Sequence, residues 1–202
     1  MTIVGGVDVS RETFEKLEAF AALVEKWTPK INLISRPSVA NLWERHIVDS
    51  VQLFKLAPEQ GRWVDIGSGG GFPGVVIAIL SAEQNANPRV TMVESDHRKC
   101  AFLRTAVREL GLSSVVISDR VENIPHLQAK IISARALTDL NTLLGFANLH
   151  LAPDGVALFP KGERWRKEHE DAQRLWSYSC EPIKSGTNPS AAVLKIKDIA
   201  RV

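Results

Sequence analysis

The chain has 202 residues, of which 45% are hydrophobic and 24% are charged, and its formal net charge is +2. These values are typical of a globular protein with a full hydrophobic core, and they exclude fibrous and intrinsically disordered classes. The sequence pI near 8.6 is compatible with a nucleic-acid partner, but it is too weakly basic to indicate one.

Neither metal binding nor membrane association is indicated. The two cysteines, Cys100 and Cys180, lie far apart without C-x-x-C spacing, which argues against a zinc site or a disulfide framework. The longest unbroken aliphatic run, from Val75 to Leu80, is too short to cross a bilayer, and the N-terminus lacks the pattern of a signal peptide. We therefore expect a cytoplasmic protein with no metal site and no membrane segment.

Residues 1–60 predict a helical extension. Ser10 is a candidate N-cap, and apolar residues follow it at helical spacing until Pro29. A similar pattern begins at Val39 and ends near Pro58, which predicts a second helix.

Residues 61–202 are expected to form one α/β domain, because strand and helix patterns alternate along them. The expected strands are residues 63–66, 89–94, 115–118, 130–134, 156–160, 177–183 and 191–197, and the expected helices are residues 73–82, 96–111, 139–149 and 163–176, with a turn at 153–155. This order predicts a doubly wound, mostly parallel sheet of seven strands. The link between the last two strands is too short for a crossover helix, so they should form an antiparallel hairpin.

A glycine-rich turn follows the first of these strands. Gly67, Gly69, Gly70 and Gly71 lack a Cβ atom, so the backbone there can approach a ligand closely. Open α/β sheets bind small molecules at the carboxyl ends of their strands. Glu94 ends the next strand and can accept hydrogen bonds from both ribose hydroxyls of an adenosine.

Two cofactors fit this turn. Gly69, Gly71 and Gly74 match the dinucleotide pattern G-x-G-x-x-G, with Glu94 lying 20 residues further on, which is the alternative of an NAD-dependent oxidoreductase. The run DIGSGGG, which begins at Asp65, also matches the D/E-x-G-x-G-x-G pattern of enzymes that use S-adenosylmethionine. An acid at this point would attract the ammonium and sulfonium of that cofactor and repel a pyrophosphate. We therefore favour S-adenosylmethionine.

Several motifs together resemble the bacterial 16S rRNA guanine-N7 methyltransferases of the RsmG family, formerly called glucose-inhibited division protein B. They are DIGSGGGFPG, VESDHRKCAFL, RVE at 120–122, SARA at 133–136 and KG at 161–162, with NLIS at 32–35 and RHIVDS at 45–50 in the helical extension. The resemblance runs from about residue 15 to the C-terminus. It implies a class I, Rossmann-like methyltransferase fold and transfer of a methyl group to N7 of guanine 527 in the 530 loop of 16S rRNA.

The resemblance also implies cofactor contacts from Gly67, Phe72, Val121, Glu122 and Arg135, in addition to Asp65, Gly69, Gly71 and Glu94. Guanine N7 carries an in-plane lone pair, so its attack on a methyl group requires no general base. Arg135 and Lys161 are therefore expected to position the reactants. The absence of the N/D-P-P-Y/F motif and of a P-C motif agrees with N7 as the target. Lys130 departs from the family, in which an acid is common at that place.

A guanine N7 is hidden in an A-form duplex, so the target should be looped or extruded and held by basic side chains. The RNA-binding candidates are Arg45, His46, Arg98, Lys99, Arg120, Lys161, Arg164 and Arg166, with Trp165 as a possible stacking surface. Each also has an ordinary structural interpretation as a solvated charge or a packed ring, and Asp49 could simply pair with Arg45. The expected partner is 16S rRNA, in the small subunit or an assembly intermediate, bound by a monomer. A ribosome-assembly module that binds RNA without catalysis is a third possibility.

Overall fold

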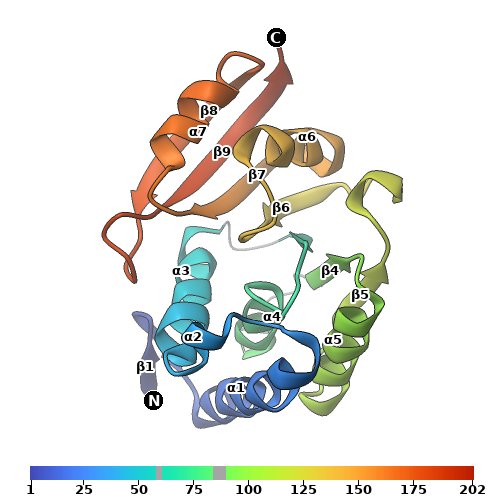
Figure 1. The fold of residues 1–202 in the computed structure, drawn as a ribbon, viewed down its shortest axis with the longest axis vertical. Coiled ribbons are helices and arrows are strands. Elements are labelled where there is room, and N and C mark those ends of the chain that lie inside the picture. The colour runs from blue at the N-terminus through green and yellow to red at the C-terminus, as the bar shows by residue number, and fades with distance from the viewer. Residues whose placement is uncertain (58–60, 84–89) are drawn as a thin grey trace.

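The computed structural model describes residues 1–57, 61–83 and 90–202 (Figure 1). Its centre is a seven-stranded sheet in the order β5-β4-β3-β6-β7-β9-β8. The strands are β3 (Trp63–Ile66), β4 (Val90–Glu94), β5 (Val115–Ser118), β6 (Ala129–Ser133), β7 (Leu151–Lys161), β8 (Trp176–Lys184) and β9 (Ala192–Arg201). Strands β3 to β7 pair in parallel, whereas β9 is antiparallel to both β7 and β8. The predicted mostly parallel sheet with an antiparallel C-terminal hairpin is confirmed.

The helices flank this sheet on both faces (Figure 1). They are α1 (Arg11–Ile31), α2 (Arg36–Val39), the π-helical segment η1 (Trp43–Val48), α3 (Asp49–Leu56), α4 (Gly74–Glu83), α5 (His97–Glu109), the 3-10 turn η2 (Val121–Asn123), α6 (Leu140–His150) and α7 (Trp165–Ala172). Within the described ranges, none of them is long and apolar enough to span a bilayer.

Two hydrophobic cores lie on opposite faces of the sheet because successive strand residues point in opposite directions. In β3, Trp63 belongs to the core formed with α1, α3, α4 and α5, whereas Val64 belongs to the core formed with α6. Leu158 and Phe159 divide in the same way in β7. The N-terminal helices therefore cover the same face as α4 and α5.

Helix α1 begins as predicted but ends later. The Ser10 side chain accepts a hydrogen bond from the Thr13 amide, so it is the N-cap. The predicted end at Pro29 is wrong, because the helix continues to Ile31 and closes at Asn32 with a φ of 51°. A proline in the last turn removes only one backbone hydrogen bond, and the chain leaves the helix just beyond it.

The predicted second helix is divided into α2, η1 and α3. Pro37 lies in the first turn of α2, where its missing N–H costs no helical hydrogen bond. In η1, the Asp49 amide bonds to the Glu44 carbonyl five residues earlier. Helix α3 ends at Leu56, and the predicted end near Pro58 lies outside the described residues.

Other boundaries also differ from the predictions. An unpredicted hairpin joins β1 (Thr2–Val4) to β2 (Val7–Val9) through Gly5 and Gly6, whose φ angles of 55° and 78° suit a two-residue turn. The turn predicted at 153–155 is wrong, because these residues lie inside β7. Helix α7 is shorter than expected and β9 is longer, while the first residue predicted for the second strand, Arg89, lies outside the described residues.

Candidate active site

The glycine-rich loop leaves the carboxyl end of β3 and turns back over β4. The amides of Gly67 and Ser68 both bond to the Val93 carbonyl, at 2.8 and 3.2 Å, which fixes the start of the loop on the neighbouring strand. Gly69 has a φ of 52°, and a Cβ atom there would meet only the Gly67 carbonyl oxygen, at 3.7 Å. The backbone at Gly69 is therefore strained for other residues, and its open side faces a cavity.

Gly71 and Gly74 are required for packing. A Cβ atom on Gly71, at a φ of 86°, would lie 2.7 Å from Val75 and 2.9 Å from Phe20. A Cβ atom on Gly74 would lie 2.8 Å from the Asp65 carboxylate. The loop therefore needs a glycine at position 71 to pass between two helices.

Asp65 lies beneath this loop and is fully buried. Its Oδ1 accepts a hydrogen bond of 2.7 Å from the Ser133 hydroxyl, and its Oδ2 accepts one of 3.2 Å from the Gly74 amide. Burial raises the pKa of the Asp65 carboxyl to about 6, although these donors act in the opposite direction. The structure therefore places the Asp65 carboxylate beneath the loop, where it is bonded to Ser133 and Gly74.

A cavity of about 460 Å³, which we call the loop cavity, lies above the glycine loop. Its wall combines the loop with the N-terminal helices and the segment after β6. The lining residues are Leu33, Ile34, Ser35, Ser38, Arg45, His46, Gly67, Ser68, Gly69, Gly70, Phe72, Glu94, Lys99, Arg135, Ala136 and Leu137. Five predicted cofactor residues thus meet here: Gly67, Gly69, Phe72, Glu94 and Arg135.

A second cavity of about 140 Å³, the strand-end cavity, lies over the ends of β4 and β5. It is lined by Gly67, Val93, Glu94, Ser95, Asp119, Arg120, Val121, Glu122, Leu137 and Phe146. Arg120 is exposed and lines this cavity together with Val121 and Glu122.

Glu94 lies where the two cavities meet, since both are lined by Gly67, Glu94 and Leu137. Its Oε2 accepts a hydrogen bond from the Gly69 amide and its Oε1 accepts one from the Asp96 amide, each of 2.8 Å. A carboxylate has about four acceptor positions, so Glu94 can still accept hydrogen bonds from a ligand. The two bonds hold it in place for that purpose.

His150 supports the strand-end cavity from below. It is fully buried, and its Nε2 lies 2.8 Å from the Val121 carbonyl oxygen. Burial lowers the pKa of His150, so the ring is neutral near pH 7 and its Nε2 carries the proton that it donates to this carbonyl. No sequence motif pointed to His150, because its partner lies 29 residues away.

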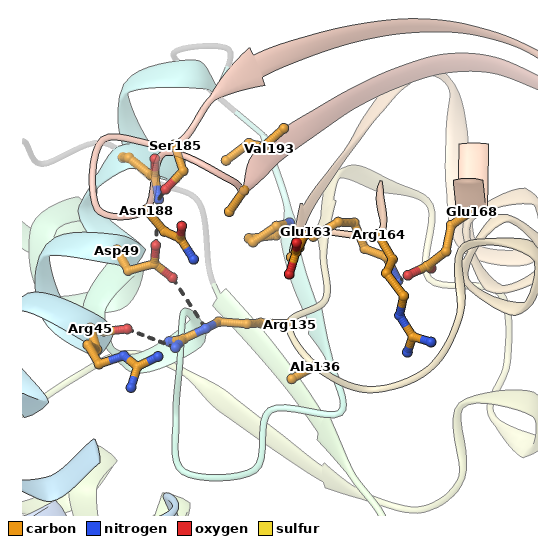
Figure 2. Close-up of a pocket in the computed structure, with 16 residues that line it drawn as sticks. Arg45, Asp49, Arg135, Ala136, Glu163, Arg164, Glu168, Ser185, Asn188 and Val193 are labelled. Atoms are coloured by element: carbon orange, nitrogen blue, oxygen red, sulfur yellow. Dashed lines mark hydrogen bonds and ion pairs between the residues drawn. The ribbon is translucent and has the colours of Figure 1, made fainter. Parts of the chain in front are cut away.

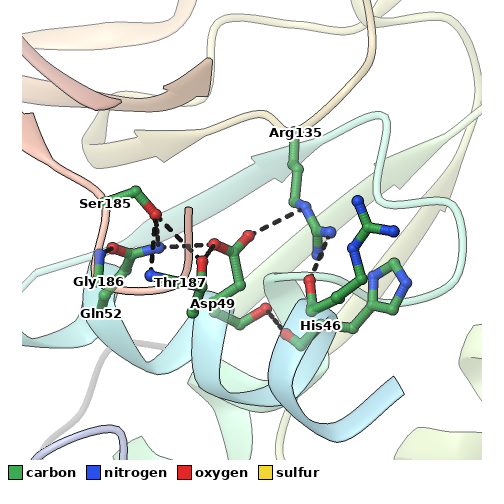
Figure 3. Close-up of polar contacts among 9 residues, drawn as sticks. His46, Asp49, Gln52, Arg135, Ser185, Gly186 and Thr187 are labelled. Atoms are coloured by element: carbon green, nitrogen blue, oxygen red, sulfur yellow. Dashed lines mark hydrogen bonds and ion pairs between the residues drawn. The ribbon is translucent and has the colours of Figure 1, made fainter. Parts of the chain in front are cut away.

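Arg135 borders the loop cavity from the segment after β6. Figure 3 shows its polar contacts with the helical extension. Its Nε lies 3.3 Å from Asp49 Oδ2, and its Nη2 donates a hydrogen bond of 2.8 Å to the Arg45 carbonyl. The remaining nitrogen, Nη1, is buried and has no partner among the described residues. Burial lowers the pKa of the guanidinium and the Asp49 carboxylate raises it, so the group remains charged. The alternative pairing of Asp49 with Arg45 is wrong.

His46 packs against the predicted cofactor residue Phe72, with ring centroids 4.9 Å apart. Burial and the nearby charges of Arg135 and Arg45 lower the pKa of His46 to about 4. The ring is therefore neutral at pH 7 and is not part of a basic rim. Its Nε2 is buried without a partner among the described residues, and the side chain borders the loop cavity.

A third cavity of about 500 Å³, the outer cavity, lies on the other side of Arg135 (Figure 2). It lies between the helical extension, the end of β7 and the loop joining β8 to β9. Its lining residues are Arg45, Asp49, Gln52, Arg135, Ala136, Pro160, Lys161, Gly162, Glu163, Arg164, Glu168, Ser185, Asn188, Ala191, Ala192 and Val193.

Lys161 is held at the wall of the outer cavity. Its Nζ lies 2.6 Å from Glu168 Oε2 and donates a hydrogen bond of 2.9 Å to the Thr138 carbonyl, and only 8% of its side chain is exposed. Glu168 Oε2 also accepts a hydrogen bond from the Leu140 amide. Lys161 therefore ties the segment after β6 to α7 and also borders the outer cavity.

The other predicted RNA contacts fall into two groups. Arg45, Lys99 and Arg164 border the loop or outer cavity. Arg98 pairs with Asp96 at 3.3 Å, and Arg166 covers the ring of Trp165 at 4.5 Å. Arg98 and Arg166 line none of these three cavities, and Trp165 is partly buried against the second core.

Leu137 is a site residue that the motifs did not identify. It follows directly after SARA, and a Cβ atom on Gly67 would lie 2.5 Å from its side chain. It is 41% exposed and separates the loop cavity from the strand-end cavity. Lys130, the departure from the family pattern, forms an ion pair with Asp154 away from these cavities.

Comparison with known proteins identifies close relatives. The family model described as rRNA small subunit methyltransferase G matches residues 13–188. Ribosomal RNA small subunit methyltransferase G of Ruegeria sp. (strain TM1040) is 55% identical over 196 residues, which cover 97% of this chain and 96% of that protein.

Solved structures share the fold at low sequence identity. A SAM dependent methyltransferase from Aquifex aeolicus matches with a TM-score of 0.61 at 15% identity, covering 87% of this chain and 97% of the other. TYW2 of M. jannaschii, in complex with AdoMet, matches with a TM-score of 0.55 at 16% identity, covering 78% and 76%. These similarities confirm the predicted Rossmann-like methyltransferase fold.

Proposed function

Because the chain belongs to the rRNA small subunit methyltransferase G family, we propose that it uses S-adenosylmethionine to methylate N7 of guanine 527 in the 530 loop of 16S rRNA. The observation that carries this proposal is the pair of adjoining cavities at the carboxyl ends of β3 to β6, which meet at Glu94. Small ligands of open α/β sheets bind at this edge, where the strand order reverses.

The residues fit the proposed cofactor. An adenosine would lie with its ribose at Glu94 and its base in the strand-end cavity, beside Val121 and Phe146. The amino acid portion would lie in the loop cavity, over the open side of Gly69. When bound, S-adenosylmethionine supplies an electrophilic methyl group on its sulfonium.

A dinucleotide fits this loop less well. Pyrophosphates bind at helix N-termini through backbone amides that have no other partner. At the start of α4, however, Pro73 has no amide hydrogen, the Gly74 amide is bonded to Asp65, and the Val75 amide is bonded to the Gly71 carbonyl. The amides at the start of α4 are therefore not free to bind a pyrophosphate. This observation, and not a charge of Asp65 that faces a ligand, favours S-adenosylmethionine over NAD.

The proposed acceptor needs orientation more than proton transfer. A lone pair on guanine N7 can attack a methyl group directly, and the sulfur leaves with the electrons of its carbon–sulfur bond. Arg135 occupies the wall between the loop cavity and the outer cavity, so it can hold the reactants in position. The neutral His46 ring beside it adds no charge.

We propose that the exposed cations Arg45 and Arg164 contact RNA phosphates, together with Lys99. The enzyme would act as a monomer in the cytoplasm on the small subunit or an assembly intermediate. Because N7 is inaccessible in an A-form helix, the target guanine must be presented from a loop or extruded.

The test is transfer from labelled S-adenosylmethionine to 30S subunits of a strain that lacks the modification, followed by mapping of N7-methylguanine in 16S rRNA. We expect one labelled guanine, at position 527. Label at another base or atom would contradict the proposed specificity. RNA binding with no transfer would support the assembly module, and binding of NADH without S-adenosylmethionine would support the oxidoreductase.

A further inference from the structure

Methyl transfer requires that donor and acceptor atoms approach to about 3 to 3.5 Å. The acceptor must therefore lie in a space that adjoins the loop cavity. The outer cavity does so, because Arg45, Arg135 and Ala136 line both. Its volume of about 500 Å³ is within the usual range for a small-molecule site.

The outer cavity contains three carboxylates, and two of them are occupied. Asp49 pairs with Arg135 and also accepts hydrogen bonds from Thr187, at 2.6 Å, and from Gln52, at 2.7 Å. Glu168 pairs with Lys161. Glu163 is exposed, forms no hydrogen bond or ion pair with any described side chain or backbone group, and borders the same cavity as Arg135 (Figure 2).

A carboxylate in this position favours guanine over the other bases. An ionised carboxylate only accepts hydrogen bonds, and its two oxygens suit two adjacent donors. On the Watson–Crick edge, guanine alone of the four RNA bases presents two adjacent donors, its N1–H and its 2-amino group. Enzymes that act on extruded bases commonly recognise this edge.

Space for a flat base is available beside this carboxylate. The preceding residue, Gly162, has no atom within 4 Å of the position that a Cβ would occupy. A base could therefore lie against the backbone at the end of β7 without meeting a side chain from that residue.

We propose that the outer cavity binds the target guanine and that Glu163 recognises its Watson–Crick edge, so that N7, on the opposite side of the base, faces the boundary with the loop cavity that Arg45, Arg135 and Ala136 form. This inference rests on the proposed function and adds a base-recognition site to it. Glu163 is then a specificity-determining residue, whereas cofactor binding depends on the other two cavities.

The test compares Glu163→Gln with the wild type in single-turnover transfer to 30S subunits lacking the modification. A glutamine turns one acceptor into a donor that opposes the guanine donors. We expect kcat/KM for the subunit to fall by roughly 10- to 100-fold, while the dissociation constant for S-adenosylmethionine changes less than about twofold, because Glu163 does not line the cofactor cavities.

Glu170→Gln is the matched control, since Glu170 is an exposed glutamate of α7 that does not line the outer cavity. It should transfer at the wild-type rate. If the wild type methylates the guanine and Glu163→Gln has an unchanged kcat/KM, the recognition site is overturned and the proposed function stands. No transfer by the wild type would instead refute the proposed function.

Discussion

Arg135 donates a hydrogen bond of 2.8 Å from Nη2 to the backbone carbonyl of Arg45, 90 residues earlier in the chain (Figure 3). In an α-helix this carbonyl would accept a hydrogen bond from the Asp49 amide. That amide instead reaches the Glu44 carbonyl, which gives the π-helical turn of η1. The hydrogen bond therefore joins the segment after β6 to the helical extension, and His46, inside η1, borders the loop cavity.

Arg135→Lys should impair methyl transfer far more than stability. A lysine ammonium cannot contact Asp49 and the Arg45 carbonyl with the planar geometry of a guanidinium. We expect kcat to fall by about 100-fold because the reactants are misplaced. The free energy of unfolding should fall by only about 1 kcal/mol, since Asp49 keeps Thr187 and Gln52 as donors.

Single-turnover transfer and urea unfolding measure these two effects. Arg166→Lys is the control, because Arg166 lines none of the three cavities. A destabilisation large enough to account for the lost activity would show that Arg135 has only a structural role.

Gly69→Val should abolish binding of S-adenosylmethionine while the protein still folds. The new side chain would extend toward the loop cavity from a residue with a φ of 52°. That conformation costs a branched residue roughly 1 to 3 kcal/mol. Calorimetric titration should show that the affinity for S-adenosylmethionine falls at least about 100-fold. This corresponds to a loss of roughly 3 kcal/mol of binding free energy.

Gly111→Val is the control that separates the effect of backbone strain from the effect of blocking the loop cavity. Gly111 has a similar φ of 62°, nothing lies within 4 Å of its absent Cβ, and it lines none of the three cavities. It should lose comparable stability and retain cofactor binding. If both variants bind the cofactor equally well, the loop cavity is not the site.

His150→Leu should weaken cofactor binding through the Val121 carbonyl. Leucine removes the donor and leaves a buried carbonyl unsatisfied, at a cost of about 1 to 3 kcal/mol. We expect the KM for S-adenosylmethionine to rise about tenfold, with kcat at saturation almost unchanged. His126→Leu, at an exposed ring whose centroid lies 6.1 Å from that of His150, is the control. A change in kcat without a change in KM would contradict this role.

Asp65 should make the protein less stable as the pH rises from about 4 to 6. Its pKa in the folded state is about 6, above the ordinary value of 3.8, so the folded protein retains a proton that the unfolded chain releases over this range. The stabilisation is complete below pH 4 and is lost as the pH approaches 6, with a total on the order of 3 kcal/mol.

Urea unfolding of Asp65→Asn and the wild type at several pH values isolates this contribution, because asparagine does not titrate. As the pH rises from 4 to 6, the unfolding free energy of the wild type should fall relative to that of the variant. Ser133→Ala removes a donor that lowers the Asp65 pKa, so it should move the transition to higher pH. Parallel curves for Asp65→Asn and the wild type would disprove the elevated pKa.

The sequence by itself determined the features that depend on neighbouring residues. Alternating patterns placed the seven strands, and the cap Ser10 marked a helix start that the structure confirms. The helix starts expected at residues 96 and 139 coincide with the N-caps of α5 and α6. The glycine loop was evident because positive φ angles require glycine locally. These signals arise within a few residues along the chain, so they do not depend on the rest of the fold.

Only the tertiary structure decided which way the polar side chains point. Asp65 turns beneath the loop because Ser133 supplies a buried donor there, and Lys161 is occupied because Glu168 lies beside it. The π-helical turn coincides with a contact from Arg135, which no pattern within the helical extension records. Buried polar groups bond to whichever complementary group the fold brings near, and that group belongs to a segment distant in sequence.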